Sequence, residues 1–115
     1  MTHLGFHYIW DIYHCKYKAI DKVPQVQNQM AELLQISNQT KLSGVFNRFA
    51  PHGVTGIDLL RECQLSVHTW SENNYVAIDL FSCVSIDTLA TVEQALRKHL
   101  CTVRIDFKIL ERGKV

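Results

Sequence analysis

The sequence predicts an α/β (α+β) fold, a two-layer sandwich in which a mostly antiparallel sheet carries two helices on one face. Six segments show the short alternating or β-branched pattern of strands, and two longer segments repeat apolar residues at helical spacing. The expected order is one strand, one helix, four strands, one helix and one strand (β-α-β-β-β-β-α-β). Because four strands follow one another without a helix between them, antiparallel pairing is favoured over parallel crossovers.

The first predicted strand covers residues 3–15, which are rich in aromatic and β-branched side chains. A helix is expected over 22–36, with Asp21 as its N-cap and Pro24 in its first turn, where a missing N–H costs little. The apolar residues that recur at helical spacing in this segment are Val23, Val26, Met30, Leu33 and Leu34.

Four consecutive strands are predicted over 41–49, 54–61, 65–72 and 75–82. The last two are separated by Asn73-Asn74, and asparagine tolerates positive φ, so a two-residue hairpin turn is expected there.

The second helix is expected after Ser85 or Asp87, either of which is a suitable N-cap. Its predicted apolar face consists of Leu89, Val92, Leu96 and Leu100. Apolar and charged residues then alternate over 103–109, which predicts the final strand.

Composition places limits on function before any motif is considered. The chain has 115 residues and a mass of 13.3 kDa, which fits one domain over residues 1–115. A net charge of +1 with scattered basic residues argues against nucleic acid or an anionic membrane surface as partner. No apolar run approaches the ~20 residues that span a bilayer, and no secretory signal pattern is visible, so a cytoplasmic protein is expected.

The four cysteines, at positions 15, 63, 83 and 101, form no C-x-x-C pair and no zinc-binding set with histidine. In the reducing compartment expected for this chain they are predicted to be free thiols. We therefore expect no metal centre.

Strand alternation gathers polar groups on the face of the sheet away from the helices. The aliphatic residues of 65–72 and 75–82 belong against the helices, and the opposite face carries His68, Trp70, Glu72, Asp79 and Cys83. A two-residue turn would set His68 opposite Asp79, whose carboxylate would hold the tautomer of the imidazole. The same register brings Cys83 to within one residue of Cys63.

Taken together, these residues resemble the small prokaryotic-type S-adenosylmethionine decarboxylases, a pyruvoyl-dependent proenzyme family of polyamine synthesis. The matching segments are Phe49, Gly53-Val54-Thr55-Gly56, Glu62 through Glu72 and Tyr75 through Cys83. The likeness extends over essentially the whole chain, and residues 49–83 carry its most specific part.

The resemblance implies a chain that cuts itself between Glu62 and Cys63. In the family a serine at the position of Cys63 attacks the preceding carbonyl, and elimination then leaves an N-terminal pyruvoyl group. That ketone forms a Schiff base with the substrate amine and takes up the electrons released with CO₂. The self-derived pyruvoyl group is thus the implied cofactor, and S-adenosylmethionine the implied substrate.

The resemblance also implies a role for each matching position. His68 and Thr55, the latter standing for a family serine, assist processing of the Glu62–Cys63 bond. Cys83 protonates the decarboxylated carbon. Phe49 and Trp70 contact the adenosyl group, and Glu72 binds the ribose hydroxyls. The family forms homodimers whose sites draw on both chains, so Phe49 is a candidate for the neighbour's site.

The main departure from the family pattern is Cys63, where the family has serine. A thiol is the better nucleophile, so an N→S acyl shift is plausible, but a thioester is also more easily hydrolysed without forming a ketone. Two alternatives therefore stand beside the decarboxylase reading. One is an uncleaved, non-catalytic homologue that binds a nucleoside or regulates an active decarboxylase. The other is a pyruvoyl-dependent decarboxylase of ornithine or arginine, against which the retained Trp70 and Glu72 argue.

Overall fold

The computed structural model describes residues 3–115 and confirms the predicted fold class. Its strands are β1 (His3–Tyr13), β2 (Lys41–Arg48), β3 (Val54–Leu60), β4 (Cys63–Trp70), β5 (Tyr75–Ser82) and β6 (Arg104–Lys114). Within the described range they form one six-stranded sheet in the order β2-β3-β4-β5-β1-β6, and every neighbouring pair is antiparallel.

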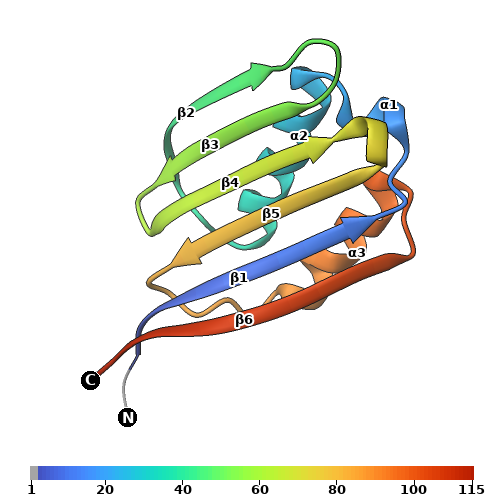
Figure 1. Cartoon of the computed structure of the whole chain (residues 1–115). Coiled ribbons are helices and arrows are strands. Elements are labelled where there is room, and N and C mark those ends of the chain that lie inside the picture. The colour runs from blue at the N-terminus through green and yellow to red at the C-terminus, as the bar shows by residue number, and fades with distance from the viewer. Residues whose placement is uncertain (1–2) are drawn as a thin grey trace.

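Helices α2 (Val23–Ile36) and α3 (Leu89–Leu100) lie on the same side of the sheet, as predicted, and the opposite face has no helix of residues 3–115 over it (Figure 1). Both helices direct their apolar residues toward the sheet, where Trp10, Leu65, Val67, Ile78 and Leu80 are almost fully buried. The buried positions of the two helices are Val26, Met30, Leu33, Leu34, Val92, Leu96 and Leu100. None of the helices within residues 3–115 combines the length and the hydropathy of a membrane-spanning segment.

A short helix, α1 (Tyr17–Ile20), was not predicted, and the predicted N-cap at Asp21 is wrong. The N-cap of α2 is Lys22, which makes no side-chain capping bond. The Asp21 carboxylate instead accepts hydrogen bonds from Arg48 and Ser71, among other donors. Several donors, one of them a charged guanidinium, satisfy the carboxylate more fully than a single capping N–H would.

The predicted caps of the second helix are also wrong. The N-cap of α3 is Thr88, again without a side-chain capping bond. Ile86 is buried, and its backbone N–H donates to the hydroxyl of Tyr8 at 3.1 Å. The segment after β5 is therefore tied to the sheet until Ile86, and the helix begins only beyond Ser85 and Asp87.

The β4–β5 turn differs from the predicted two-residue hairpin. The strands pair Trp70 with Tyr75, so four residues form the connection, including the 3₁₀ turn η1 (Ser71–Asn73). Asn74 adopts the left-handed conformation with φ 54°, which asparagine tolerates. The true register is displaced by two residues from the predicted one. An even displacement keeps every side chain on its predicted face but changes its partner across the strands.

Candidate active site

Cys63 lies at the start of β4, directly after the turn that contains Glu62. Its φ is +151°, a region that non-glycine residues rarely occupy and that costs on the order of 1–3 kcal/mol. The Sγ atom lies 3.0 Å from Sγ of Cys83. The backbone N–H of Cys83 donates to the carbonyl oxygen of Glu62 at 3.0 Å. A nucleophilic side chain, a strained backbone and a polarised carbonyl thus meet at one peptide bond.

The thiol of Cys63 is held in its protonated form. Burial raises its pKa above the ordinary value, and the hydrogen bond and charge of the neighbouring Cys83 raise it further. The carboxylate of Glu62 accepts a hydrogen bond from the backbone N–H of Thr40 at 2.9 Å. This bond engages the carboxylate with Thr40 and not with the thiol of Cys63. A base is therefore needed before Cys63 can attack a carbonyl.

Thr55 and His68 face each other across β3 and β4. Oγ1 of Thr55 lies 3.2 Å from Nδ1 of His68, and both residues are partly exposed. The expected pairing of His68 with Asp79 is wrong, because the longer turn places His68 opposite Ala77. Asp79 is bound instead to Nε2 of His7 on β1 at 3.1 Å.

An aromatic group occupies the far end of β4. Trp70 is 45% exposed, and its ring centroid lies 5.4 Å from that of Tyr75 and 6.1 Å from that of His68. Beside it is a hollow of about 390 Å³, lined by Tyr13, Trp70, Asn73 and Tyr75. The Tyr75 hydroxyl donates to Asp11, and burial together with this carboxylate raises the pKa of the phenol. The hollow offers flat apolar surfaces of the kind that receive a planar ring.

Phe49 and Glu72 lie on two loops that share one buried anchor. Asp21 accepts from the backbone N–H of Gly53 at 3.2 Å, in the loop that follows Phe49. It also accepts from Ser71 Oγ at 2.6 Å, in the turn that carries Glu72. These donors and Arg48 hold the pKa of the Asp21 carboxyl well below its usual range. No local pattern in the sequence indicates this role, because Arg48, Gly53 and Ser71 are 27 or more positions away from Asp21.

Gly53 is required by the path of that loop. Its φ is +100°, and a Cβ built at this position would lie 2.7 Å from the carbonyl oxygen of Thr69. Its own carbonyl accepts the N–H of Phe49 at 2.8 Å and closes the loop. Phe49 remains 50% exposed.

Within one chain the candidate residues form two separate groups. Cys63, with Glu62 and Cys83 beside it, lies at one end of β4. His68 is five residues further along the strand, which corresponds to roughly 16 Å at ~3.3 Å per residue. Trp70 lies beyond it, at the other end of the strand. Glu72 follows in the turn η1, and Phe49 is hydrogen-bonded to Gly53, which packs against Thr69 at the same end. A single copy of the chain does not bring His68 to Cys63.

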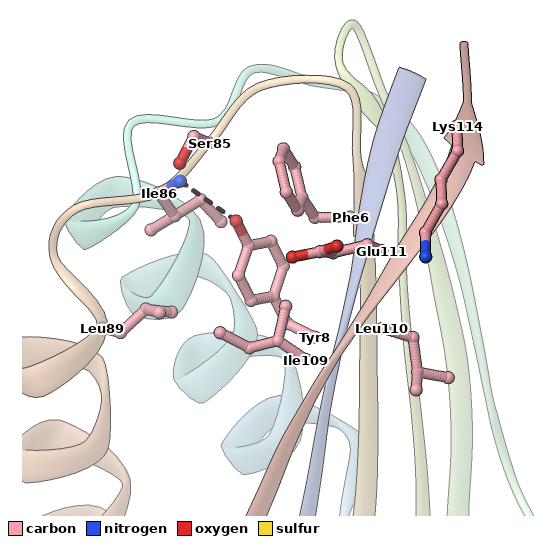
Figure 2. A pocket seen from close by; sticks show the side chains of 9 residues that line it. All are labelled: Phe6, Tyr8, Ser85, Ile86, Leu89, Ile109, Leu110, Glu111 and Lys114. Atoms are coloured by element: carbon pink, nitrogen blue, oxygen red, sulfur yellow. Dashed lines mark hydrogen bonds between the residues drawn. The ribbon is translucent and has the colours of Figure 1, made fainter. Parts of the chain in front are cut away.

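A groove larger than the hollow beside Trp70 lies on the helix side of the sheet. It has a volume of about 440 Å³ and is lined by residues of β1, β6 and the segment before α3, among them Phe6, Tyr8 and Glu111 (Figure 2). None of the site residues predicted from the sequence lines it. The groove therefore does not contain the candidate chemistry.

The family profile described as S-adenosylmethionine decarboxylase matches residues 6–113. The chain is 39% identical over 112 residues to the S-adenosylmethionine decarboxylase proenzyme of Sulfurihydrogenibium sp. (strain YO3AOP1), covering 97% of this chain and 84% of that protein. The chain belongs to the S-adenosylmethionine decarboxylase family. The proenzyme of Thermotoga maritima is 35% identical over 115 residues, with 99% of this chain and 88% of that protein covered.

The fold agrees with this membership of the decarboxylase family. The crystal structure of the adenosylmethionine decarboxylase from Aquifex aeolicus VF5 superposes with a TM-score of 0.89 at 30% identity. It covers 100% of this chain and 95% of that one. The resemblance inferred from residues 49–83 is confirmed and extends over nearly the whole chain.

Proposed function

We propose that the chain is a decarboxylase precursor that cuts its own Glu62–Cys63 bond and acts on S-adenosylmethionine in polyamine (spermidine) synthesis. The pyruvoyl group it would use is made from Cys63. The observation that carries this proposal is the N–H of Cys83 on the Glu62 carbonyl oxygen, beside the Cys63 thiol. The free thiols are consistent with the cytoplasm as the compartment in which it works.

In the proposed cleavage, Sγ of Cys63 adds to the carbonyl carbon of Glu62, and the amide nitrogen of Cys63 leaves as a free amine. The peptide bond thereby becomes a thioester. The N–H of Cys83 already donates to the oxygen that gains negative charge in this step, which is the task of an oxyanion hole. Loss of the Cα proton of residue 63 and of the thiocarboxylate from its Cβ gives dehydroalanine. Water then adds and ammonia leaves, which produces the ketone.

The pyruvoyl ketone supplies the electron sink for decarboxylation. We assign Cys83 to hold the proton that the product carbon takes up, since its sulfur lies 3.0 Å from that of Cys63. Phe49 and Trp70 are proposed to contact the adenosyl group with their exposed rings, and the exposed Glu72 to accept hydrogen bonds from the ribose hydroxyls.

The division of the site along β4 leads us to propose that two copies of the chain complete it. The uncovered face of the sheet exposes Val45, Ile57 and Leu59, by 70%, 46% and 55%, close to one another on β2 and β3. Exposed apolar groups of this kind mark association surfaces. We propose that two copies stack these faces against each other, related by a two-fold axis that is perpendicular to the strands. Their β4 strands then run in opposite directions, so the Cys63 end of one chain lies over the His68 end of the other. His68 with Thr55 would then serve as the base of the partner.

Mixing two defective chains tests this arrangement. His68→Ala keeps the cysteine pair, and Cys63→Ala keeps the Thr55–His68 pair, so neither chain should cleave alone. When the two are co-expressed in equal amounts, about half of the His68→Ala chains should be cut, because about half of all dimers are mixed. Cleavage of neither chain in proven mixed dimers would contradict the shared site.

Intact mass of the purified protein is the principal test of function. We expect two fragments that meet between Glu62 and Cys63, the second beginning with a pyruvoyl group, in which a ketone oxygen replaces the α-amino group of residue 63 and a methyl group replaces its CH2SH side chain. Cys101→Ser, which changes an exposed thiol outside the site, is the matched control and should be cut equally. A single 13.3 kDa species that binds the nucleoside without releasing CO₂ would identify the non-catalytic homologue instead. CO₂ release from ornithine or arginine alone would identify the changed substrate.

A further inference from the structure

Cys63 and Cys83 form a pair of free thiols that the other two cysteines do not match. Their sulfurs are 3.0 Å apart, Cys83 is exposed and Cys63 is partly exposed. Cys15 is buried, and its burial raises the pKa of its thiol to about 12. Cys101 is exposed, but its sulfur contacts the carbonyl oxygen of Lys98. Only the first pair thus combines access with a neighbouring sulfur among residues 3–115.

The backbone around this pair suits a covalent link. Cys63 pairs directly with Ser82, the last residue of β5, so Cys83 is offset from it by one residue. Strands ~4.8 Å apart and a one-residue offset of ~3.3 Å give a Cα separation of roughly 6 Å. This lies within the range of about 4.4–6.8 Å that disulfides require. Side-chain rotation alone can bring the sulfurs from contact to bonding distance.

We propose that Cys63 and Cys83 are an oxidative modification site, which a peroxide converts into an intramolecular disulfide in the uncut chain. The exposed Cys83 thiol is oxidised first, giving a sulfenic acid and one water while the peroxide is reduced. The Cys63 sulfur then displaces the sulfenic oxygen as a second water, and the S–S bond forms. A dithiol reductant reverses the reaction by thiol–disulfide exchange.

The consequence for maturation rests on the proposed function. Sγ of Cys63 is the atom that must attack the Glu62 carbonyl, and in the disulfide it has no thiol to offer. Oxidation therefore keeps the chain in its precursor form, and reduction releases it to cleave. A serine at position 63 would allow no such control, because a hydroxyl does not form a disulfide. Once cleavage has consumed the Cys63 side chain, the site no longer exists.

The full chain carrying His68→Ala provides a test of the link itself, because the proposed cleavage lacks its base there and the precursor persists. This chain is treated with hydrogen peroxide, alkylated and digested without reductant. Mass spectrometry should find the peptides that contain Cys63 and Cys83 joined, with a mass two hydrogens below the sum of the two reduced peptides. Cys83→Ser in the same background should remove the link, and Cys101→Ser should leave it intact. Oxidation of Cys63 and Cys83 to separate, unlinked acids would overturn the inference.

The regulatory consequence is measured in the unmodified chain, made by cell-free translation with peroxide or with dithiothreitol. We expect peroxide to lower cleavage about ten-fold or more and dithiothreitol to restore it. Equal cleavage under both conditions would overturn the inference. Formation of the link together with an absence of cleavage under reduction would instead contradict the proposed function and leave the modification site standing.

Discussion

Replacement of Asp21 tests whether one buried carboxylate holds the two loops that carry Phe49 and Glu72. Asp21 is 5% exposed. It accepts hydrogen bonds from Ser71 Oγ, Arg48 Nη2, Tyr17 Oη and the Gly53 N–H, at 2.6, 2.8, 3.0 and 3.2 Å. In Asp21→Asn the amide nitrogen would face donors, and the charge opposite Arg48 is lost.

The expected cost is about 3 kcal/mol, the lower end for removal of one partner of a buried ion pair, because Arg48 is itself 41% exposed. For a chain of this length that corresponds to a fall in Tm on the order of 10 °C. Thermal denaturation followed by circular dichroism measures it. Asp87→Asn is the matched control, since Asp87 is an exposed carboxylate, and it should leave Tm nearly unchanged.

The lowered pKa of Asp21 also predicts how its contribution to stability changes with pH. The pKa of Asp21 is lowered in the folded chain, so its contribution is fully present above the ordinary carboxyl pKa of ~3.9. It is lost as the pH falls from there toward the lowered value. The Tm difference between the wild-type chain and Asp21→Asn should therefore be constant at neutral pH and shrink below about pH 4. A difference as large at pH 3 as at pH 7, or a Tm equal to that of Asp87→Asn, would refute the reasoning.

Three further substitutions test the site. Cys63→Ser should cleave at least as fast as the wild-type chain, as measured by gel electrophoresis of freshly made protein. If the variant folds but stays uncut, a residue other than Cys63 prevents cleavage. Cys83→Ala keeps the backbone N–H on the Glu62 carbonyl, so it should be cut but should release CO₂ about 10²–10⁴-fold more slowly; normal turnover would exclude the proton role. Gly53→Ala should lower stability by about 1–3 kcal/mol, because φ is +100° and Cβ would meet the Thr69 carbonyl. An unchanged Tm would contradict that strain.

Much of the fold was predictable because its signals are periodic. Both main helices follow apolar repeats, and the alternation in β4 and β5 correctly assigned buried and exposed faces. The β4–β5 connection was not predictable in the same way. Asn73-Asn74 suggested two turn residues, whereas Ser71 is drawn into the connection by its hydrogen bond to Asp21, fifty positions away in the chain. Local sequence carries no information about such a contact.

The candidate site was predictable in its composition and in one of its contacts. The proximity of Cys63 and Cys83 followed from two strands joined in sequence, and their sulfurs are 3.0 Å apart. The partner of His68 did not follow, because the register depends on the turn length. His7 was overlooked for a related reason: its contact with Asp79 depends on β1 inserting between β5 and β6, a topology that no short-range pattern encodes.

The position of Cys63 makes the proposed maturation depend on two conditions outside the chain's own fold. Its thiol is protonated, since burial and Cys83 raise its pKa, and the imidazole of His68 on the same chain is roughly 16 Å along a rigid strand. In the proposed shared site the base comes from a second copy, which makes association the first condition. The neighbour that raises this pKa is also a sulfur within bonding reach, which makes reduction the second. A hydroxyl at position 63 would be subject to the first condition alone, so the exchange of serine for cysteine adds a chemical control without altering the architecture of the site.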